Sequence, residues 1–507
     1  MSMKASCTKA FLMSISLLTM VLFLTVYPIG GLAVAFGSSA YQAPVPEDFS
    51  GLSWREAFER LHGKFSREYA FTDWKRINWP VLYANFKPRI DRAQASKDFT
   101  AYYRALKEYV HSIPDGHVRM TAIRDIDYKY IGGGFGFSAT KLSNGKVIAN
   151  WVDEISEAYA QGMRPGAELI EWNGQPIDEV LDGVVTVFGP NAATAEDTVN
   201  QRVCYLTRAP INTRLSVAFS INGERAGATV VAYDDNGLSL SKIYPIAVVP
   251  DGLRELILNV DNPRNPPQSM VEKKVLDGNI GYIKIWGELD IDLKSEGKTP
   301  STLGLFRAAL TEFNKAKLKG LIVDIRNNVG GFDSMAADML ASFYQEEVLY
   351  EYVKYFNPNT GSWEYYRNVD PAGKKPIKPG LYIRPVEPFF GGPVIALINS
   401  KCVSTCEGLA MGIRNLPHGE TVGFYGTNGS FGMAGDEALM PGGLKITWPF
   451  GQSLDKNRQV QLDSREGVGG VSPSIRTPMT KAAALRVANG EDVELEHAIA
   501  IINSLAR

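Results

Sequence analysis

The chain has 507 residues, which is enough for two or three domains that each bury a hydrophobic core. Hydrophobic residues make up 45% of it and charged residues 21%, as in ordinary globular proteins. The formal net charge of -2 gives no general attraction to nucleic acid or to an anionic membrane surface, so neither is expected as a partner on the grounds of charge.

The first 40 residues have the pattern of an export leader. Lys4 and Lys9 precede a dense apolar segment at residues 11–27, and the sequence AVA at residues 33–35 has the small-x-small pattern of a signal-peptidase site. The apolar segment is also long enough to remain as a membrane anchor. We therefore expect the body of the protein to be periplasmic, anchored to the cell envelope or secreted, with the leader either cleaved or kept.

Residues 50–125 are expected to form a helical domain, because aromatic and aliphatic residues recur there at helical spacing. They are Trp54, Phe58, Leu61, Phe65, Tyr69, Phe99, Tyr102, Leu106, Tyr109 and Val110. The segment ends in the sequence IPDGHVRM, where Pro114 and Gly116 stop the last helix. His117 lies in this turn and is one of five histidines in the chain, and it is either solvated there or a general base.

Residues 128–237 form a second, β-rich module. A glycine loop, a strand, a short helix, a Pro-Gly turn and a strand that ends in an Asn-Gly turn follow one another there. This order resembles a PDZ domain. The resemblance implies that a loop captures the C-terminal carboxylate of a peptide through the amides of Gly134, Phe135, Gly136 and Phe137, while the peptide adds to the sheet as a strand. Otherwise these glycines only shape a hairpin.

The remainder of the chain has the alternating strands and helices that are typical of an α/β protein. Residues 238–275 are rich in proline and are expected to be a linker or a strand that crosses between domains. From residue 276 to residue 507 strands and helices alternate, which predicts an α/β core whose loops gather at one edge of a sheet. The expected strands are residues 279–287, 320–331 and 394–399, and the expected helices are residues 301–317, 334–344, 406–415 and 493–505.

Ser404 is the candidate nucleophile, because it lies between a buried strand and a helix. Unpaired amides and the positive end of the helix dipole would face its side chain there. A serine in this place is otherwise only a helix cap, so chemistry also requires a base and hydrogen-bond donors for an oxyanion. The amide of Thr405 and an amide of the Gly330-Gly331 loop would supply those donors, since glycine lets a backbone N–H approach a substrate closely.

Four segments occur in the order seen in the S41 peptidases, namely GYIKI, IVDIRNNVGG, VIALINSKCVSTCEGLA and GVSPSI. The chain thus resembles the tail-specific or C-terminal processing proteases and their tricorn-core relatives, over nearly all of its length after the leader. The resemblance implies a multidomain α/β fold with a ClpP/crotonase-like protease core. It also implies that Ser404 is the nucleophile and that Gly331 and Thr405 supply the oxyanion hole.

The base decides which branch of the family the chain resembles. Members with a Ser-Lys dyad carry a lysine in a glycine-flanked motif after the serine, and here the matching sequence VGFYGTNGSFG has Ser430 or a neighbour instead. The tricorn-like branch uses a histidine of the N-terminal domain, which His117 resembles. The branch also implies an acid before the GV-x-P motif. Glu466 is preferred and Asp463 is the alternative, with Asp463 otherwise a solvated loop carboxylate, and Glu407 is expected only to complement the helix dipole.

Three cysteines follow the leader. Cys402 and Cys406 bracket the candidate nucleophile and either form a disulfide or fill space as buried thiols, and Cys204 lies far from them in the sequence. Their spacing is not typical of zinc sites, and we expect no metal and no cofactor.

The sequence therefore predicts an exported serine endopeptidase that acts on proteins or peptides through Ser404, His117 and Glu466 and recognises them by a PDZ-like module. Two alternatives share the scaffold. One is a non-catalytic protein that binds peptides or apolar ligands, and the other is a PDZ-based assembly scaffold. The serine, the histidine and the double glycine together favour the peptidase, because a carrier needs none of them.

Overall fold

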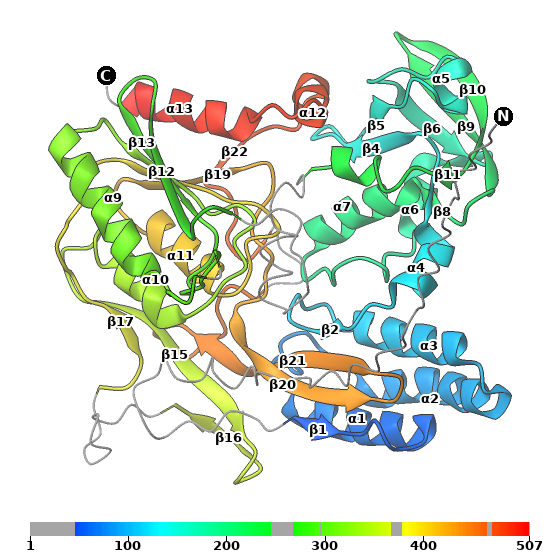
Figure 1. Ribbon diagram of the computed structural model, residues 1–507, viewed down its shortest axis with the longest axis horizontal. Helices are drawn as coiled ribbons and strands as arrows, with labels where there is room; N and C mark the ends of the chain where they lie inside the picture. Colours follow the sequence, from blue (N-terminus) through cyan, green and yellow to red (C-terminus); the bar gives the residue numbers. More distant parts are fainter. Residues whose placement is uncertain (1–45, 245–266, 295, 367–377, 464–468, 506–507) are drawn as a thin grey trace, which may run out of the picture.

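The computed structural model (Figure 1) describes residues 46–244, 267–294, 296–366, 378–463 and 469–505. The predicted leader, residues 1–40, and the preferred acid Glu466 lie outside these residues. Among the helices described, none combines the length and the apolar character needed to cross a membrane.

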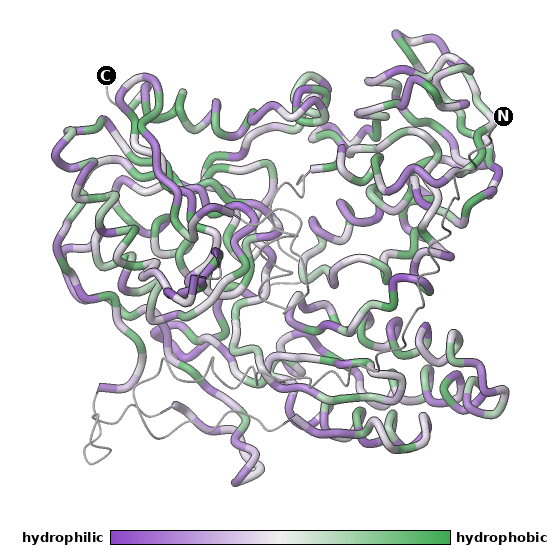
Figure 2. Tube along the Cα trace, viewed as in Figure 1, coloured by the Kyte–Doolittle hydropathy of each residue, from purple (hydrophilic) through white to green (hydrophobic). Residues whose placement is uncertain are grey.

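Three amphipathic helices form the N-terminal part, and Figure 2 shows hydrophobic and hydrophilic segments alternating along them. They are α1 (Trp54–Glu68), α2 (Trp79–Ser96) and α3 (Phe99–His111). Each begins at a polar residue, Ser53, Asn78 or Asp98, whose side chain accepts a hydrogen bond from an amide of the first turn. Such caps satisfy backbone donors that a helix leaves unpaired, so the sequence determines these starts locally.

The hydrophobic core of these helices is completed by a hairpin from the C-terminal part of the chain. Strands β20 (Gly432–Met440) and β21 (Leu444–Leu454) pack on the helices, and the fully buried Trp448 stacks on Phe65. The predicted helical domain at residues 50–125 is therefore not closed on itself. Its core includes a hairpin that lies more than three hundred positions away in the sequence.

The same hairpin belongs to a seven-stranded sheet with the order β1-β20-β21-β15-β16, in which β17 also pairs with β15 and β2 with β21. The remaining strands are β1 (Glu47–Asp48), β2 (Arg119–Met120), β15 (Val348–Asn357), β16 (Ser362–Tyr365) and β17 (Leu381–Ile383). Strand β2 begins two residues after His117, so its pairing with β21 attaches the histidine turn to the C-terminal half of the protein.

The second module, cyan to green in Figure 1, contains an antiparallel sheet of order β10-β9-β6-β5-β4 with β7 beside β6. The strands are β4 (Phe137–Lys141), β5 (Val147–Val152), β6 (Glu168–Trp172), β7 (Gln175–Pro176), β9 (Arg214–Ile221) and β10 (Glu224–Val231). The helices are α4 (Arg124–Ile131), α5 (Glu157–Ala160), α6 (Ile177–Asp182) and α7 (Ala195–Leu206). Strand β4 is at the edge of the sheet, and α7 lies beside it.

A small sheet of order β11-β3-β8 adjoins this module. It consists of β3 (Gly133–Gly134), β8 (Arg208–Ala209) and β11 (Tyr233–Asp234), and a 3-10 turn, η2 (Leu240–Lys242), follows it.

The α/β core has a six-stranded sheet of order β12-β13-β14-β18-β19-β22, in which only β12 is antiparallel to its neighbour. The strands are β12 (Val271–Leu276), β13 (Ile280–Ile285), β14 (Leu321–Asp324), β18 (Val394–Leu397), β19 (Gly419–Gly423) and β22 (Ile475–Arg476). The helices are α9 (Thr302–Ala316), α10 (Asp333–Leu340), α11 (Thr405–Arg414), α12 (Lys481–Ala488) and α13 (Val493–Leu505).

Helices cover both faces of this sheet, as the continuous apolar runs of its strands require. Leu321 and Val323 of β14 point to the side of α9, α10 and α11, whereas Ile322 between them packs toward α13. Because the central strands are parallel, the loops after β14 and β18 leave the sheet at the same edge. Those two loops carry the double glycine and Ser404.

The structure confirms the predicted multidomain α/β class and most of the predicted elements. Helix α13 has the predicted bounds, and α9 lies between the predicted limits with Ser301 and Lys317 as its two caps. The end of the proline-rich segment at residues 238–275 is not a linker, because β12 pairs with β13 along its whole length.

Candidate active site

Ser404 occupies a strained turn between β18 and α11, with φ 64° and ψ -132°. Positive φ is uncommon for a residue with a side chain, and residues held in such strained conformations cluster at active sites. The amide of Ser404 donates to the carbonyl of Ser430 at 3.1 Å, and its carbonyl accepts from the amide of Glu407 at 2.8 Å. Its side chain makes no capping hydrogen bond to α11 and is half-buried, so the hydroxyl is not used as a helix cap.

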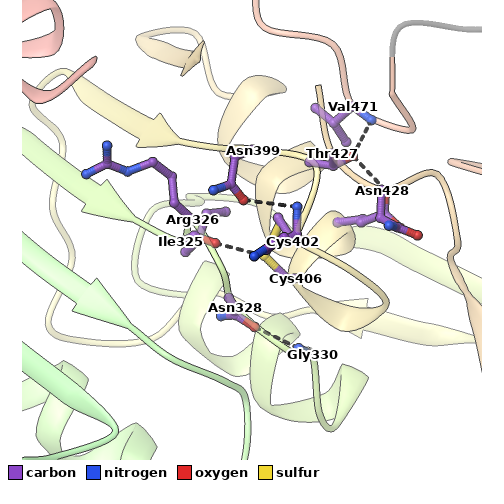
Figure 3. Close-up of a disulfide and its surroundings, with 12 residues drawn as sticks. Ile325, Arg326, Asn328, Gly330, Asn399, Cys402, Cys406, Thr427, Asn428 and Val471 are labelled. Carbon is purple, nitrogen blue, oxygen red and sulfur yellow. Dashed lines mark hydrogen bonds between the residues drawn. A yellow bond between two sulfur atoms is a disulfide. The ribbon is translucent and has the colours of Figure 1, made fainter. Parts of the chain in front are cut away.

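A disulfide between Cys402 and Cys406 spans this turn (Figure 3). Both cysteines are fully buried, and their Cα atoms are 5.6 Å apart, within the usual range for a disulfide. The structure thus decides between the two alternatives that the sequence left open. Cys204 carries a free thiol.

The glycine loop after β14 lies directly against the nucleophile. A Cβ on Gly330 would be 2.8 Å from the Cβ of Ser404 and 3.3 Å from the amide nitrogen of Thr405. The hydroxyl of Thr405 donates to the carbonyl of Gly331 at 2.8 Å. Both predicted oxyanion donors therefore belong to segments in contact with each other and with Ser404.

The other side of the glycine loop is attached to Glu288. In a parallel bridge, the amide of Glu288 donates to Gly330 and the amide of Phe332 donates to Glu288, at 3.2 and 2.9 Å. The bridge uses these two amides and not that of Gly331. The N–H of Gly331 is thus directed away from the bridge.

The histidine turn reaches the same place through Ser430. The amide of Gly116 donates to the hydroxyl of Ser430 at 2.8 Å, while the carbonyl of Ser430 accepts from the amide of Ser404. A side chain at Gly116 would overlap Asn428, which shows how closely the two segments approach. Ser430 therefore joins the histidine segment to the nucleophile turn.

His117 has the surroundings of a neutral imidazole. The residue is 6% exposed, and its carbonyl accepts a hydrogen bond from the hydroxyl of Thr447 at 3.2 Å. Burial lowers the pKa of His117 to about 4, although the neighbouring Asp115 opposes this. At neutral pH the ring is therefore uncharged and able to accept a proton.

Asp115 is the acid beside His117, which sequence reasoning missed. One oxygen of Asp115 accepts the backbone amide of His117 at 2.8 Å and lies 3.7 Å from Nδ1 of the ring. Among the described residues, nothing forms a hydrogen bond with that Nδ1. The motif Asp-Gly-His contained the signal, because an aspartate readily accepts the amide two residues later in a turn.

A buried charge cluster lies behind this acid. Lys75, from the turn between α1 and α2, lies 2.7 Å from Asp463 and 3.9 Å from Asp115, and all three side chains are fully buried. The hydroxyl of Tyr69 donates to Asp115 at 2.8 Å. The expectation that Asp463 is a solvated loop carboxylate is therefore wrong. Its partner Lys75 lies almost four hundred positions earlier, so no local pattern in the sequence indicates the pairing.

The charges of this cluster are unequal, because one cation faces two carboxylates. Burial alone would lower the pKa of Lys75, but Asp463 and Asp115 outweigh it and raise that pKa, so the lysine stays charged. Burial raises the pKa of Asp463, Lys75 opposes the shift and Asp115 adds to it. Asp463 therefore holds a proton more readily than an ordinary aspartate.

Glu407 does more than complement the dipole of α11. It is fully buried and accepts hydrogen bonds from the hydroxyl of Thr427 and the amides of Gly429 and Ser430, at 2.6, 2.7 and 2.8 Å. Burial raises the pKa of Glu407 to about 7, against the effect of these donors. Glu407 thus shapes the loop whose Ser430 contacts both the nucleophile turn and the histidine turn.

The predicted peptide-binding loop of the second module is buried. Gly133 and Gly134 pair with β8 on one side and β11 on the other, and the rings of Phe135 and Phe137 lie against Trp172. A hollow of about 520 Å³ lies elsewhere on this module, lined in part by Lys141, Leu181 and Arg202. Lys141 ends the edge strand β4, so this hollow is at the end of β4 opposite the predicted loop.

Within the described residues, no three His, Cys, Asp or Glu side chains are grouped as metal ligands would be.

Two family models match parts of the chain. The model of peptidase family S41 matches residues 279–476, which include the double glycine, Ser404 and Asp463. The model of the tricorn protease C1 domain matches residues 51–101, which include Lys75. His117 lies outside both matches. No curated protein matches the chain by sequence.

The fold is similar to that of solved structures. Mature CPAF complexed with lactacystin is 15% identical, with a TM-score of 0.59, and the match covers 89% of this chain and 98% of that one. Mature CPAF is 14% identical, with a TM-score of 0.58, and the match covers 87% of this chain and 98% of that one. At these identities the similarity concerns the fold alone.

Proposed function

The chain belongs to peptidase family S41 and is a serine peptidase, and from this premise we propose that it is an endopeptidase that uses Ser404 as nucleophile and His117 as base. Its substrates are proteins or peptides. The observation that carries the proposal is the position of Ser430, whose hydroxyl and carbonyl accept the amides of Gly116 and Ser404. This one residue ties together the two segments that supply the base and the nucleophile.

In the proposed reaction, the hydroxyl oxygen of Ser404 attacks the carbonyl carbon of the scissile peptide bond. His117 takes the hydroxyl proton and delivers it to the leaving amine as the bond breaks. The amides of Gly331 and Thr405 donate to the oxygen on which negative charge develops. A water molecule then attacks the acyl-enzyme, with His117 again as the base, and releases the second product.

The imidazolium that forms in this reaction requires a nearby negative charge. Glu466 is the predicted source. In the described part of the chain, Asp115 is the carboxylate beside the ring of His117. Lys75 lies within ion-pair distance of both Asp115 and Asp463. The charge of Asp115 opposes the effect of burial on the pKa of His117, so the pocket accepts a positive charge on the ring more readily than its burial alone would allow.

The location and the mode of recognition belong to the same proposal. We place the enzyme outside the cytoplasm, supported by the leader sequence and by the disulfide, because disulfides persist mainly in oxidising compartments. We further propose that the PDZ-like module selects substrates, including by their C-termini. The glycine loop is buried, and the edge strand β4 is also buried at four of its five residues, with α7 beside it. Capture of a peptide at either place therefore requires that part of the module to open.

Substitution of two serines that precede helices tests the proposal. Ser404→Ala should abolish hydrolysis of an unfolded protein and labelling by a fluorophosphonate, with little change in Tm, because its hydroxyl caps no helix. Ser301→Ala should do the opposite, since the Ser301 hydroxyl accepts the amide of Gly304 at 3.0 Å and its loss costs about 1 kcal/mol of stability. Undiminished hydrolysis by Ser404→Ala would remove Ser404 from the mechanism, and a wild type that neither hydrolyses nor reacts would favour the non-catalytic carrier.

A further inference from the structure

The disulfide surrounds the nucleophile. Cys402 and Cys406, which Figure 3 shows bonded, are four positions apart in the sequence. The bond therefore closes a ring of five residues, and Ser404 is the middle one. Ser404 has the positive φ that residues with side chains avoid. Such a conformation persists only where its surroundings determine it several times over. The covalent ring is one of those determinants.

Two of the backbone hydrogen bonds that also hold this turn are long. Val403 donates to the carbonyl of Asn328 at 3.3 Å, and Ser404 donates to that of Ser430 at 3.1 Å. Both are at the long end of the usual range for such bonds. Cys406, by contrast, is fixed within the first turn of α11, so the disulfide ties the entrance of the turn to a rigid helix.

Cys402 also supports the other half of the site. Its carbonyl accepts the amide of Asn428 at 2.9 Å, and the loop that begins there continues to Ser430, which contacts the histidine segment. A shift of Cys402 would therefore move Ser404. It would also move the loop whose Ser430 holds the segment that carries His117. Both consequences affect the distance between the reacting groups.

Reduction would force such a shift. Two thiols in van der Waals contact occupy more space than two bonded sulfurs, and both cysteines are completely buried. The Sγ of Cys406 already lies 3.4 Å from the carbonyl oxygen of Ile325. Since protein interiors are packed without spare volume, the separated sulfurs would push the turn apart.

The ring is short. In the chain-entropy model a disulfide stabilises a protein by restricting the unfolded chain, and the effect is smaller for short loops than for long ones. A bond across five residues also constrains the local geometry of the folded chain, and here that geometry is the one around Ser404.

We propose that the Cys402–Cys406 disulfide positions the nucleophile, so that the peptidase is active only in its oxidised form. This rests on the function proposed above. The two thiols are oxidised by exchange with a disulfide donor. The thiolate of one cysteine displaces one sulfur of the donor, the second cysteine resolves the mixed disulfide, and two electrons and two protons pass to the donor, which leaves as a dithiol. The chain is then inactive in a reducing cytoplasm and becomes active after export.

The first test replaces the cysteines. Cys402→Ala, Cys406→Ala and the double variant should each lower kcat by about 100-fold, the scale expected for a misplaced reacting group, and should leave KM within about twofold of the wild-type value. The three losses should be equal, because either substitution removes the same bond. Cys204→Ala, which removes the free thiol, should retain wild-type activity. Equal kcat in the double variant and the wild type would overturn the proposal.

The second test uses the wild-type chain and applies even where a variant does not fold. The full chain is produced under reducing conditions, its thiols are counted by alkylation and mass spectrometry, and its folding is checked by circular dichroism. Activity and fluorophosphonate labelling of Ser404 should rise in proportion to the oxidised fraction when a disulfide donor is added. A folded, fully reduced enzyme with wild-type kcat would contradict the proposal. The failure of the proposed function itself is seen separately, as unchanged hydrolysis by Ser404→Ala.

Discussion

Gly330→Ala tests the site most directly, because Gly330 touches the nucleophile without taking part in the proposed chemistry. Gly330 has φ +82°, and a Cβ there would lie 2.8 Å from both the Cβ of Ser404 and the carbonyl oxygen of Val403. Carbon atoms in contact are normally about 3.5–4.0 Å apart. The alanine methyl must therefore displace the nucleophile turn, the glycine loop or both by about 1 Å in total.

Gly223→Ala is the matched control. Gly223 has φ +89° in the turn between β9 and β10, and a Cβ there would meet nothing within 4 Å. The left-handed backbone costs an alanine about 1–2 kcal/mol at either position. The two variants thus share the backbone penalty, and only Gly330→Ala adds a collision at the site.

The expected effect on catalysis follows from that collision. A displacement of about 1 Å near the reacting groups lowers the rate by about 100-fold. That loss corresponds to about 2.7 kcal/mol of transition-state stabilisation. Gly223→Ala should keep kcat/KM within about twofold of the wild-type value. This substitution lowers the stability of the folded state but does not change the geometry of the candidate active site.

The assay compares kcat/KM on an unfolded protein substrate with Tm for both variants. We expect both to lower Tm and only Gly330→Ala to lower kcat/KM. Wild-type kcat/KM in Gly330→Ala, together with the same fall in Tm as in Gly223→Ala, would show that the glycine loop does not lie against the working nucleophile. The assignment of Gly331 and Thr405 as oxyanion donors would then also fail.

Three further predictions concern the base and its surroundings. His117→Gln should lower kcat by about 10²–10⁴-fold with little change in KM, and an effect on KM alone would exclude His117 as the base. Burial lowers the pKa of His117 to about 4, and the base acts only when neutral. We therefore expect kcat/KM to keep its full value above that pH and to fall as the pH decreases through it. A pH–rate profile that instead falls at the ordinary histidine pKa of 6.5 would contradict the buried position of His117. Lys75→Met should remove about 3–5 kcal/mol of stability at pH 8, because it leaves the buried carboxylates of Asp463 and Asp115 without their cation. The loss should be smaller at pH 5, because burial raises the pKa of Asp463, the variant lacks the lysine that opposes this shift, and protonation of Asp463 restores stability as the pH falls. Denaturant titrations that give the same loss at both pH values would refute this.

Local patterns in the sequence were sufficient to predict the elements that depend on their own residues. Helix α9 is an example, because Ser301 caps its start, Lys317 ends it in the left-handed conformation and the apolar residues between them recur at helical spacing. Strand β5 and the strand–turn–helix around Ser404 were predicted for the same kind of reason. The roles of Ser404, His117, Gly331 and Thr405 stay predictions, although the structure brings their segments together.

Other features depend on partners that are remote in the sequence. Asp463, the acidic alternative to Glu466, is one case. It is buried in an ion pair with Lys75, which belongs to the helical part of the chain. The glycine loop of the PDZ-like module is another, since β8 and β11 pair with both of its edges and cover it. Glu407 is a third, because the loop that it holds begins twenty positions after it.

The sequence by itself determined the α/β class, the caps and periods of the main elements and the strand-to-helix turn that carries the candidate nucleophile. Each of these depends on interactions between residues a few positions apart. Only the tertiary structure decided that the hairpin of β20 and β21 completes the helical core, that the two cysteines around Ser404 are bonded and that a buried lysine lies behind the base. These features depend on which distant segments of the chain pack against each other. The charge and the residue spacing within one segment do not indicate which other segment it packs against.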